Sequence, residues 1–240
     1  MNDISAHLDR FYLLLSRLHA LDGQGLPLNS YNGKSAFPAR GVYFFAEPGE
    51  FRSPSSGQLR VVRVGTHAVS IGAKSTLWKR LRAHRGTRSG GGNHRGSIFR
   101  LHVGAALLAR EGKAIHTWGV GSSVPPDVRQ SEPLRATEEA WEQKVSQFIG
   151  GMSVLWIDVP DTPGPNSSRA FIERNAIALL SNHLVPVEAA SAGWLGHHSP
   201  REDIRLSNLW NLNHVHETYD PLFLEKLEAA VEQTVKRNQI

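Results

Sequence analysis

The chain has 240 residues, of which 40% are hydrophobic, and it carries a formal net charge of +5 at pH 7. That length fits one domain with appendages or two small domains, and no stretch reaches the roughly 18 apolar residues of a membrane span. Cysteine is absent, which excludes disulfide bonds and thiolate zinc sites. The default expectation is a cytoplasmic protein with no membrane partner.

The first third of the chain predicts one helix, a hairpin and a second helix. Apolar side chains at three- and four-residue spacing predict a helix over 4–20. β-branched and aromatic residues predict strands over 41–47 and 59–65, joined as a hairpin with an enlarged tip. Ser75 or Thr76 is expected to cap a helix that ends near His84.

The rest of the chain predicts one more strand among helices. The expected elements are helix 97–110, helix 136–149 with Thr137 as its cap, strand 153–159, and a helix from Ser167 or Ser168 to about Asn182. Ser199-Pro200 and Asp220-Pro221 are each expected to begin a further helix. The elements predict a small, antiparallel sheet with helices on it, and a helical C-terminal part.

Positive charge is concentrated in one short segment. Seven cations and no acid occupy this stretch of 22 residues: Lys79, Arg80, Arg82, Arg85, Arg88, Arg95 and Arg100. Such a concentration is typical of a phosphate-binding surface, although a basic face exposed to solvent is the alternative. Glycines and histidines lie among the arginines, which favours nucleic acid as the partner.

The stretch from the second strand to the next helix also has features of a phosphate-binding loop. Lys74-Ser75 follows a strand and precedes a helix, and Asp158 ends a later strand, where an acid could bind magnesium. However, Gly72 is separated from Lys74 by Ala73, which puts the lysine out of register with a loop that must curl around one phosphate. The sequence therefore argues against an ATPase.

A different set of motifs occurs in order along the chain. One strand opens with Gly41-Val42-Tyr43, and the next closes with Arg63-Val64-Gly65. RLRAH ends at His84 on the following helix, and IERNAIALL begins a later helix at Ile172. This order resembles the GIY-YIG nuclease superfamily over about residues 41–182, and bacterial proteins carry this domain. The resemblance implies an α+β fold, a three-stranded antiparallel sheet flanked by helices, here with extra N- and C-terminal helices.

The resemblance also implies a catalytic role for five residues. They are Tyr43, Arg63, Arg80, His84 and Glu173. By resemblance, the phenol of Tyr43 contacts the attacking water and acts as a base, and Glu173 holds a single Mg²⁺ or Mn²⁺ ion. Arg80 and His84 are four residues apart and so share one helix face, where Arg80 can clamp a phosphate and His84 can bind the phosphate or Tyr43.

Arg63 departs from the family pattern, which usually has a second tyrosine at this position. By period-two alternation it shares a strand face with Leu59 and Val61, where an arginine needs a partner or a phosphate. A long side chain reaching solvent from an edge strand is the equal alternative. The departure leaves the identity of the base open. Asn182 is a weaker candidate for an asparagine that follows the glutamate in many members.

Further residues are expected to contact DNA. They are Lys74, Lys79, Arg82, Arg85, Asn93, His94, Arg95 and Arg100. The histidine pairs His197-His198 and His214-x-His216 are interpreted as surface or structural residues, because two histidines are too few for a closed zinc site.

Two functions are compatible with these motifs. The first is a metal-dependent DNA endonuclease with a nuclease domain over 1–185. The alternative is a nucleic-acid-binding module on the same fold that no longer cuts. Residues 186–240 are expected to form a helical extension that packs on the core or on a partner, and a homodimer or a larger complex is compatible with either function.

Overall fold

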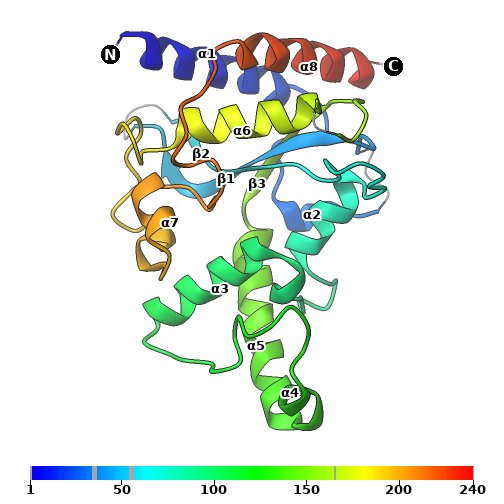
Figure 1. Cartoon of the computed structure of the whole chain (residues 1–240), viewed down its shortest axis with the longest axis vertical. Coiled ribbons are helices and arrows are strands. Elements are labelled where there is room, and N and C mark those ends of the chain that lie inside the picture. Colours follow the sequence, from blue (N-terminus) through cyan, green and yellow to red (C-terminus); the bar gives the residue numbers. More distant parts are fainter. Residues whose placement is uncertain (1, 34–36, 54–56, 165, 240) are drawn as a thin grey trace.

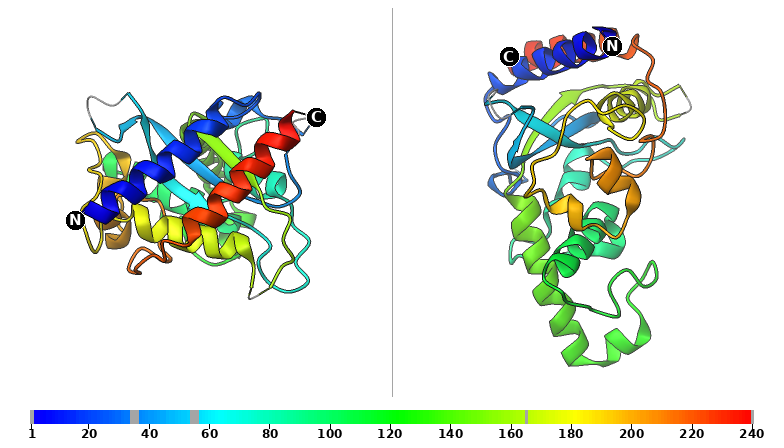
Figure 2. Two further views of the ribbon diagram at one scale, coloured as in Figure 1. Left: turned by 90° about the horizontal axis from the view of Figure 1, so that it is seen from above. Right: turned by 90° about the vertical axis from the view of Figure 1, so that its left-hand side faces the viewer.

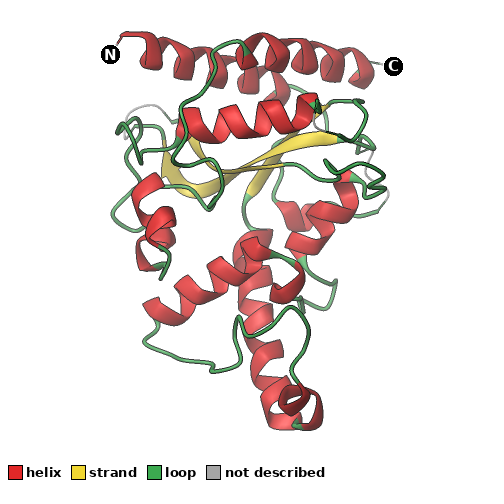
Figure 3. Ribbon diagram, in the orientation of Figure 1, coloured by secondary structure: helices red, strands yellow, loops and turns green. Residues whose placement is uncertain are grey.

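The computed structural model describes residues 2–33, 37–53, 57–164 and 166–239. In this part of the chain, three strands form one antiparallel sheet in the order β2-β1-β3. The strands are β1 (Gly41–Phe51), β2 (Leu59–Gly65) and β3 (Ser153–Asp158). Helices cover both faces of the sheet (Figure 3), which confirms the predicted α+β fold.

The helices agree with the sequence except at three N-termini and at the short α4, which lies in a stretch expected to be a loop. Their bounds are α1 Asn2–His19, α2 Leu77–Arg85, α3 Ile98–Arg110, α4 Pro126–Gln130, α5 Glu132–Gly150, α6 Ser168–Leu180, α7 Glu202–Ser207 and α8 Phe223–Asn238. Among the described residues, no helix combines the length and apolar character that a membrane crossing needs. Short 3₁₀ turns occur at Leu28–Ser30, His94–Gly96 and Leu195–His198.

The three differences at N-termini have local causes. α5 begins earlier than predicted because Ser131 caps it by accepting from the Leu134 N–H, whereas the Thr137 hydroxyl donates to the Pro133 carbonyl inside the helix. Ser199-Pro200 and Asp220-Pro221 each lie in a turn, and α7 and α8 begin two or three residues later. By contrast, Thr76 and Ser167 cap α2 and α6 as expected.

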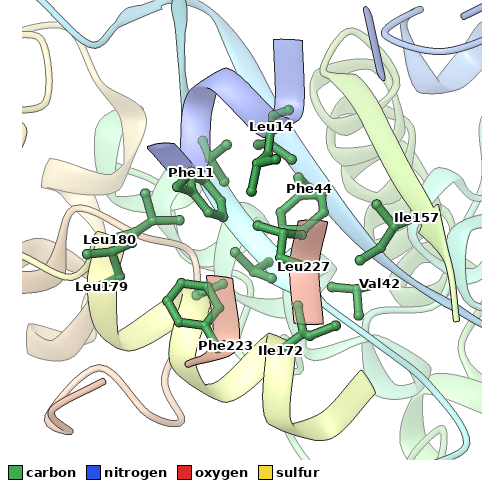
Figure 4. Packing of buried hydrophobic residues seen from close by; sticks show 14 of the residues in the cluster. Phe11, Leu14, Val42, Phe44, Ile157, Ile172, Leu179, Leu180, Phe223 and Leu227 are labelled. Carbon is green, nitrogen blue, oxygen red and sulfur yellow. The ribbon is translucent and has the colours of Figure 1, made fainter. Parts of the chain in front are cut away.

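The sheet separates two hydrophobic clusters. Side chains alternate along β1, so that Val42 and Phe44 enter one cluster and Tyr43 and Phe45 enter the other. The first cluster lies between the sheet and α1, α6 and α8, and Figure 4 shows its packing around Phe44. The second cluster lies between the sheet and α2, α3 and α5. These helices are on the side of the sheet opposite α1, α6 and α8 (Figure 1).

An irregularity in β2 changes the expected side of Arg63. Phe45 pairs with Arg63, but the next residue of β1, Ala46, pairs with Val61, so Val62 has no opposite residue. Such a bulge interrupts the alternation of faces. The predicted shared face of Val61 and Arg63 is therefore wrong: Val61 packs in the first cluster, whereas the Arg63 guanidinium lies over the ring of Phe99 in the second.

The C-terminal segment packs on the sheet. The Trp210 N–H donates to the Val62 carbonyl at 2.7 Å, and the Asn211 side chain accepts from the Val64 N–H and donates to its carbonyl. These bonds cover the free edge of β2. Further along, α8 lies beside α1 over the first cluster (Figure 2), with Leu224 fully buried. Residues 186–240 were expected to pack on the core or on a partner, and the structure shows this segment packed on the core.

The packing of α8 leads to a stability prediction. Leu224→Ala should lower the free energy of unfolding by about 2–5 kcal/mol, because it removes a buried side chain and leaves a cavity. Leu222→Ala is the matched control, since Leu222 is 59% exposed at the start of the same helix and should change stability by less than about 0.5 kcal/mol. Urea denaturation followed by circular dichroism measures both. A separate early transition for α8 would contradict its place in the common core.

Candidate active site

A cavity of about 150 Å³ opens beside the edge of β2. Its lining comes from β2, α2, α3, α6 and the segment after α7, through residues that include Arg63, Arg80, His102, Glu173, Asn211 and His214. Three of the predicted catalytic residues, Arg63, Arg80 and Glu173, thus meet at one place. Tyr43 and His84 are fully buried and do not line the cavity, although Tyr43 adjoins Arg63.

The glycines of the two tripeptides are needed for close approach. Gly65 lies opposite Tyr43 on the neighbouring strand, and a Cβ atom there would be 2.2 Å from the phenol oxygen. A Cβ on Gly41 would be 2.1 Å from the Ile157 carbonyl oxygen. Any side chain at Gly65 would therefore displace the Tyr43 ring, which explains why a strand that otherwise favours β-branched residues ends in glycine.

Tyr43 belongs to a buried chain of hydrogen bonds. Its hydroxyl lies 2.9 Å from His84 Nε2, and His84 Nδ1 lies 2.8 Å from the Ser97 hydroxyl oxygen. Burial and then the nearby Arg80, Arg63 and Arg100 hold the pKa of His84 well below its usual value, so the imidazole is neutral. Ser97 Oγ also accepts from the Arg100 N–H. This geometry fits a tautomer in which Nδ1–H donates to Ser97 and Nε2 accepts from Tyr43.

Two arginines line the cavity with donors that are not fully used. Arg63 donates from Nη1 to the Trp210 carbonyl at 2.6 Å. The Nε atoms of Arg63 and Arg80 are both buried without a hydrogen-bond partner among the described residues. Burial lowers the pKa of Arg63, while Tyr43 and Glu173 oppose that effect. Two guanidinium groups with buried, unused Nε donors suit an anion that can accept from both.

Glu173 faces these cations from α6. Its Oε1 accepts from the Thr66 N–H at 3.0 Å, and no described residue donates to Oε2. Burial raises the pKa of Glu173, although the Thr66 N–H and the charges of Arg63, His214 and Arg80 act in the opposite direction. A carboxylate oxygen that lines a cavity without a donor is a suitable ligand for a divalent ion, so the site fits the ion that the sequence resemblance implies.

Three residues at the cavity were missed by sequence reasoning: His102, Asn211 and His214. Burial lowers the pKa of His102 to about 4, and the positive charges of Arg63 and Arg201 act in the same direction. The buried Nε2 atom of His102 has no hydrogen-bond partner among the described residues. Asn211 binds the backbone of β2, and His214 has a left-handed backbone with φ of 67°. None of them lies in a recognisable motif, because they reach the cavity through long-range packing.

Three of the residues predicted to contact DNA instead have side chains that are buried in ion pairs. Arg100 is fully buried and donates to Glu142, and His94 is hydrogen-bonded to the same carboxylate. The Arg95 side chain is 3% exposed and paired with Glu138. A charge that is desolvated and paired inside the protein does not reach a phosphate outside it.

Other predicted contacts remain at the surface. Lys74, Lys79, Arg82 and Asn93 are exposed, and Arg85 is partly exposed over the ring of Trp78. Except for Lys74, they line a groove of about 680 Å³ together with Arg88. No acid of the described residues forms an ion pair with these cations. Burial lowers the pKa of Arg85, and the positive charges of Arg88 and Arg82 lower it further.

Asn182 has a structural role in a turn away from the cavity lining. Its side chain accepts from the N–H groups of Val187 and Glu188 and donates to the Glu188 carbonyl. Asn182 is therefore not part of the cavity lining, which includes Asn211 and Asn213 instead.

Comparison with known proteins identifies the family. The model of the GIY-YIG domain matches residues 2–237. The chain therefore belongs to the GIY-YIG family, whose members are nucleases, and the match includes the C-terminal segment as well as the motif-bearing part. No curated protein and no solved structure matches the chain.

The raised pKa of Glu173 predicts a pH-dependent effect on stability. The pKa of Glu173 is higher in the folded than in the unfolded state. As pH rises through the folded-state pKa, the wild type therefore loses stability relative to a variant with a neutral side chain at this position. Glu173→Gln should therefore unfold at a higher temperature than the wild type at pH 8. The difference should vanish at about pH 4, below the unfolded pKa of a glutamate.

Thermal unfolding at several pH values, in EDTA, measures this effect. Glu225→Gln is the control, because Glu225 is an exposed acid on α8. A Glu173→Gln variant that is less stable than the wild type at pH 8 would show that the contact with the Thr66 N–H outweighs the burial of the charge.

Proposed function

We propose that the protein is a metal-dependent endonuclease that hydrolyses phosphodiester bonds of DNA in the cavity beside β2. The observation that carries this proposal is the meeting of Arg63, Arg80 and Glu173 around one small cavity. Two guanidinium groups with unused donors provide an anion site, and the carboxylate provides a metal ligand. A module that only bound DNA would gain nothing from a carboxylate at this place, because it repels phosphate.

The two arginines are proposed to hold the scissile phosphate. Hydrolysis places additional negative charge on the phosphoryl oxygens, and fixed donors aimed at these oxygens stabilise the transition state. Arg63 is held by the Trp210 carbonyl and by Phe99, so its guanidinium has little freedom to reorient. Arg63 would thus supply a charge where most family members have a tyrosine.

Tyr43 is proposed to take the proton from the attacking water. Its own proton is directed to His84 Nε2, which leaves the lone pairs of the phenol oxygen as acceptors. Arg63 lies beside the phenol, close to where the attacking water would be held. A neutral phenol can take a proton only as it gives up its own, so the Tyr43 proton would pass along this hydrogen bond to Nε2 of the neutral His84. The phenol is fully buried, so access of water requires a small displacement of Arg63.

Glu173 would hold the Mg²⁺ or Mn²⁺ ion. When bound, such an ion stabilises negative charge on the phosphate and on the leaving oxygen. The Thr66 N–H fixes one oxygen of the carboxylate and leaves the other for the ion.

The basic groove on α2 is proposed to bind the DNA backbone next to the cut site. α2 presents Arg80 to the cavity, whereas Lys79 and Arg82 face the groove. Because one short helix carries Arg80 and the cations of the groove, a DNA strand bound along the groove would be led toward Arg80. Cations without acidic partners keep their charge available for phosphates.

A nicking assay tests the enzymatic proposal. The wild type should nick supercoiled plasmid in Mg²⁺ or Mn²⁺ and not in EDTA. Tyr43→Phe should lower the rate by about 10²–10⁴-fold if the phenol is the base, and Arg80→Ala by about 10²–10³-fold if the guanidinium stabilises the transition state. Glu173→Gln should lose metal-dependent cleavage.

The matched controls are Tyr219→Phe and Glu225→Gln, which remove the same chemical groups at places outside the cavity. A wild type that binds plasmid at low salt but never cuts linear, supercoiled or branched DNA in either metal would support the non-cutting binding module.

The groove predicts a change in the salt dependence of DNA binding. Arg82→Gln combined with Arg88→Gln should reduce the slope of log K against log salt by up to two, about one for each phosphate that the protein no longer neutralises. Arg110→Gln removes an exposed charge at the end of α3 and should leave the slope unchanged. Fluorescence anisotropy of a labelled duplex, in EDTA to prevent cleavage, measures the slope. An unchanged slope in the double variant would place the DNA elsewhere.

A further inference from the structure

Two histidines and an aspartate meet outside the candidate active site. His183 follows the end of α6, Asp203 lies in the first turn of α7, and His216 lies in the segment between α7 and α8. One possible ligand atom from each of them lies within 4.8 Å of the others. The three segments come together only through the fold, so the sequence shows no spacing that is typical of a metal site.

The imidazoles are arranged as neighbouring metal ligands would be. His183 Nδ1 and His216 Nδ1 are 3.3 Å apart, with ring centroids separated by 4.0 Å and ring planes at 77°. Two nitrogens that each lie 2.0–2.1 Å from a tetrahedral zinc ion are themselves about 3.3 Å apart. The observed distance between the two nitrogens therefore matches the distance between neighbouring ligands of such an ion.

The carboxylate completes the set. Asp203 Oδ1 lies 2.9 Å from His216 Nε2. Arg201 approaches only the other oxygen, Oδ2, at 3.7 Å. His216 Nε2 is across the ring from the Nδ1 that faces His183, so the Asp203 carboxylate or the His216 ring must turn for all three residues to bind one ion. One possible ligand atom of each already lies within 4.8 Å of the others, which keeps that rearrangement local. Asp203 is partly exposed, which leaves room for that rotation and for a water as the fourth ligand.

We propose that His183, Asp203 and His216 bind a zinc-type transition-metal ion that fixes the segment between α7 and α8. Imidazole and carboxylate ligands suit zinc better than magnesium, which prefers oxygen ligands alone. This ion is distinct from the one proposed at Glu173. His214, two residues before His216, lines the candidate active site, so the ion would hold in place the wall of that cavity. The binding itself does not depend on the proposed nuclease activity.

Zinc binding to the full chain tests the proposal without DNA. After treatment with EDTA and removal of the chelator, calorimetric titration should show one zinc ion per chain, and Co²⁺ in its place should show the visible absorption of a tetrahedral site. His183→Ala, His216→Ala and Asp203→Asn should each weaken zinc binding by about 100-fold or more. Acidification should release the ion, because imidazole binds metals only when deprotonated.

Two control variants separate this site from other histidines and from the candidate active site. His198→Ala removes an exposed histidine outside the cluster, and Glu173→Gln removes the proposed ligand of the other ion. Both should bind zinc as the wild type does. Hydrogen exchange of residues 208–217 should slow when zinc is added to the wild type.

The proposal would be overturned if the wild type did not bind zinc stoichiometrically. It would also be overturned if variants of the three residues, shown to be folded by circular dichroism, bound zinc as well as the wild type does. Loss of zinc binding in Glu173→Gln but not in His216→Ala would move the ion to the candidate active site and would also overturn it.

Discussion

The hydrogen bonds between the edge of β2 and the segment at Trp210 and Asn211 hold the site together. The sheet has three strands, and the backbone groups along the free side of β2 would otherwise remain unpaired. The C-terminal segment binds them through one backbone bond and two bonds of an asparagine side chain. The same segment then supplies the carbonyl that holds Arg63 and one wall of the cavity.

Local chemistry made much of the fold predictable. The strand tripeptides, the caps at Thr76 and Ser167 and the helix periodicity all act within a few residues, so their effects can be read from the sequence. The positions of Arg63, Arg80 and Glu173 followed from the family resemblance. The bulge at Val62 was not predictable, because it depends on how β2 pairs with β1, and it decides which face Arg63 occupies.

The sequence also could not sort the cations between 79 and 100. All seven appear equivalent along the chain, but Arg95 and Arg100 find Glu138 and Glu142 on α5, about 40 residues later. Those two arginines hold α5 to the preceding segment, while the cations nearer α2 stay at the surface. The distinction between buried structural charges and surface charges thus depends on acids whose positions only the tertiary structure reveals.

The packing of α1 beside α8 affects when the site can form during synthesis. Arg10 and Glu228, which form an ion pair between these helices, are 218 residues apart in the chain, and such long-range contacts are slow to form. While a ribosome still holds the last helix, the first hydrophobic cluster lacks one of its sides. The cavity also needs the segment at 210–214. The walls of the cavity therefore come together only after residues 210–214 have folded onto the edge of β2, late in the order of synthesis of this domain.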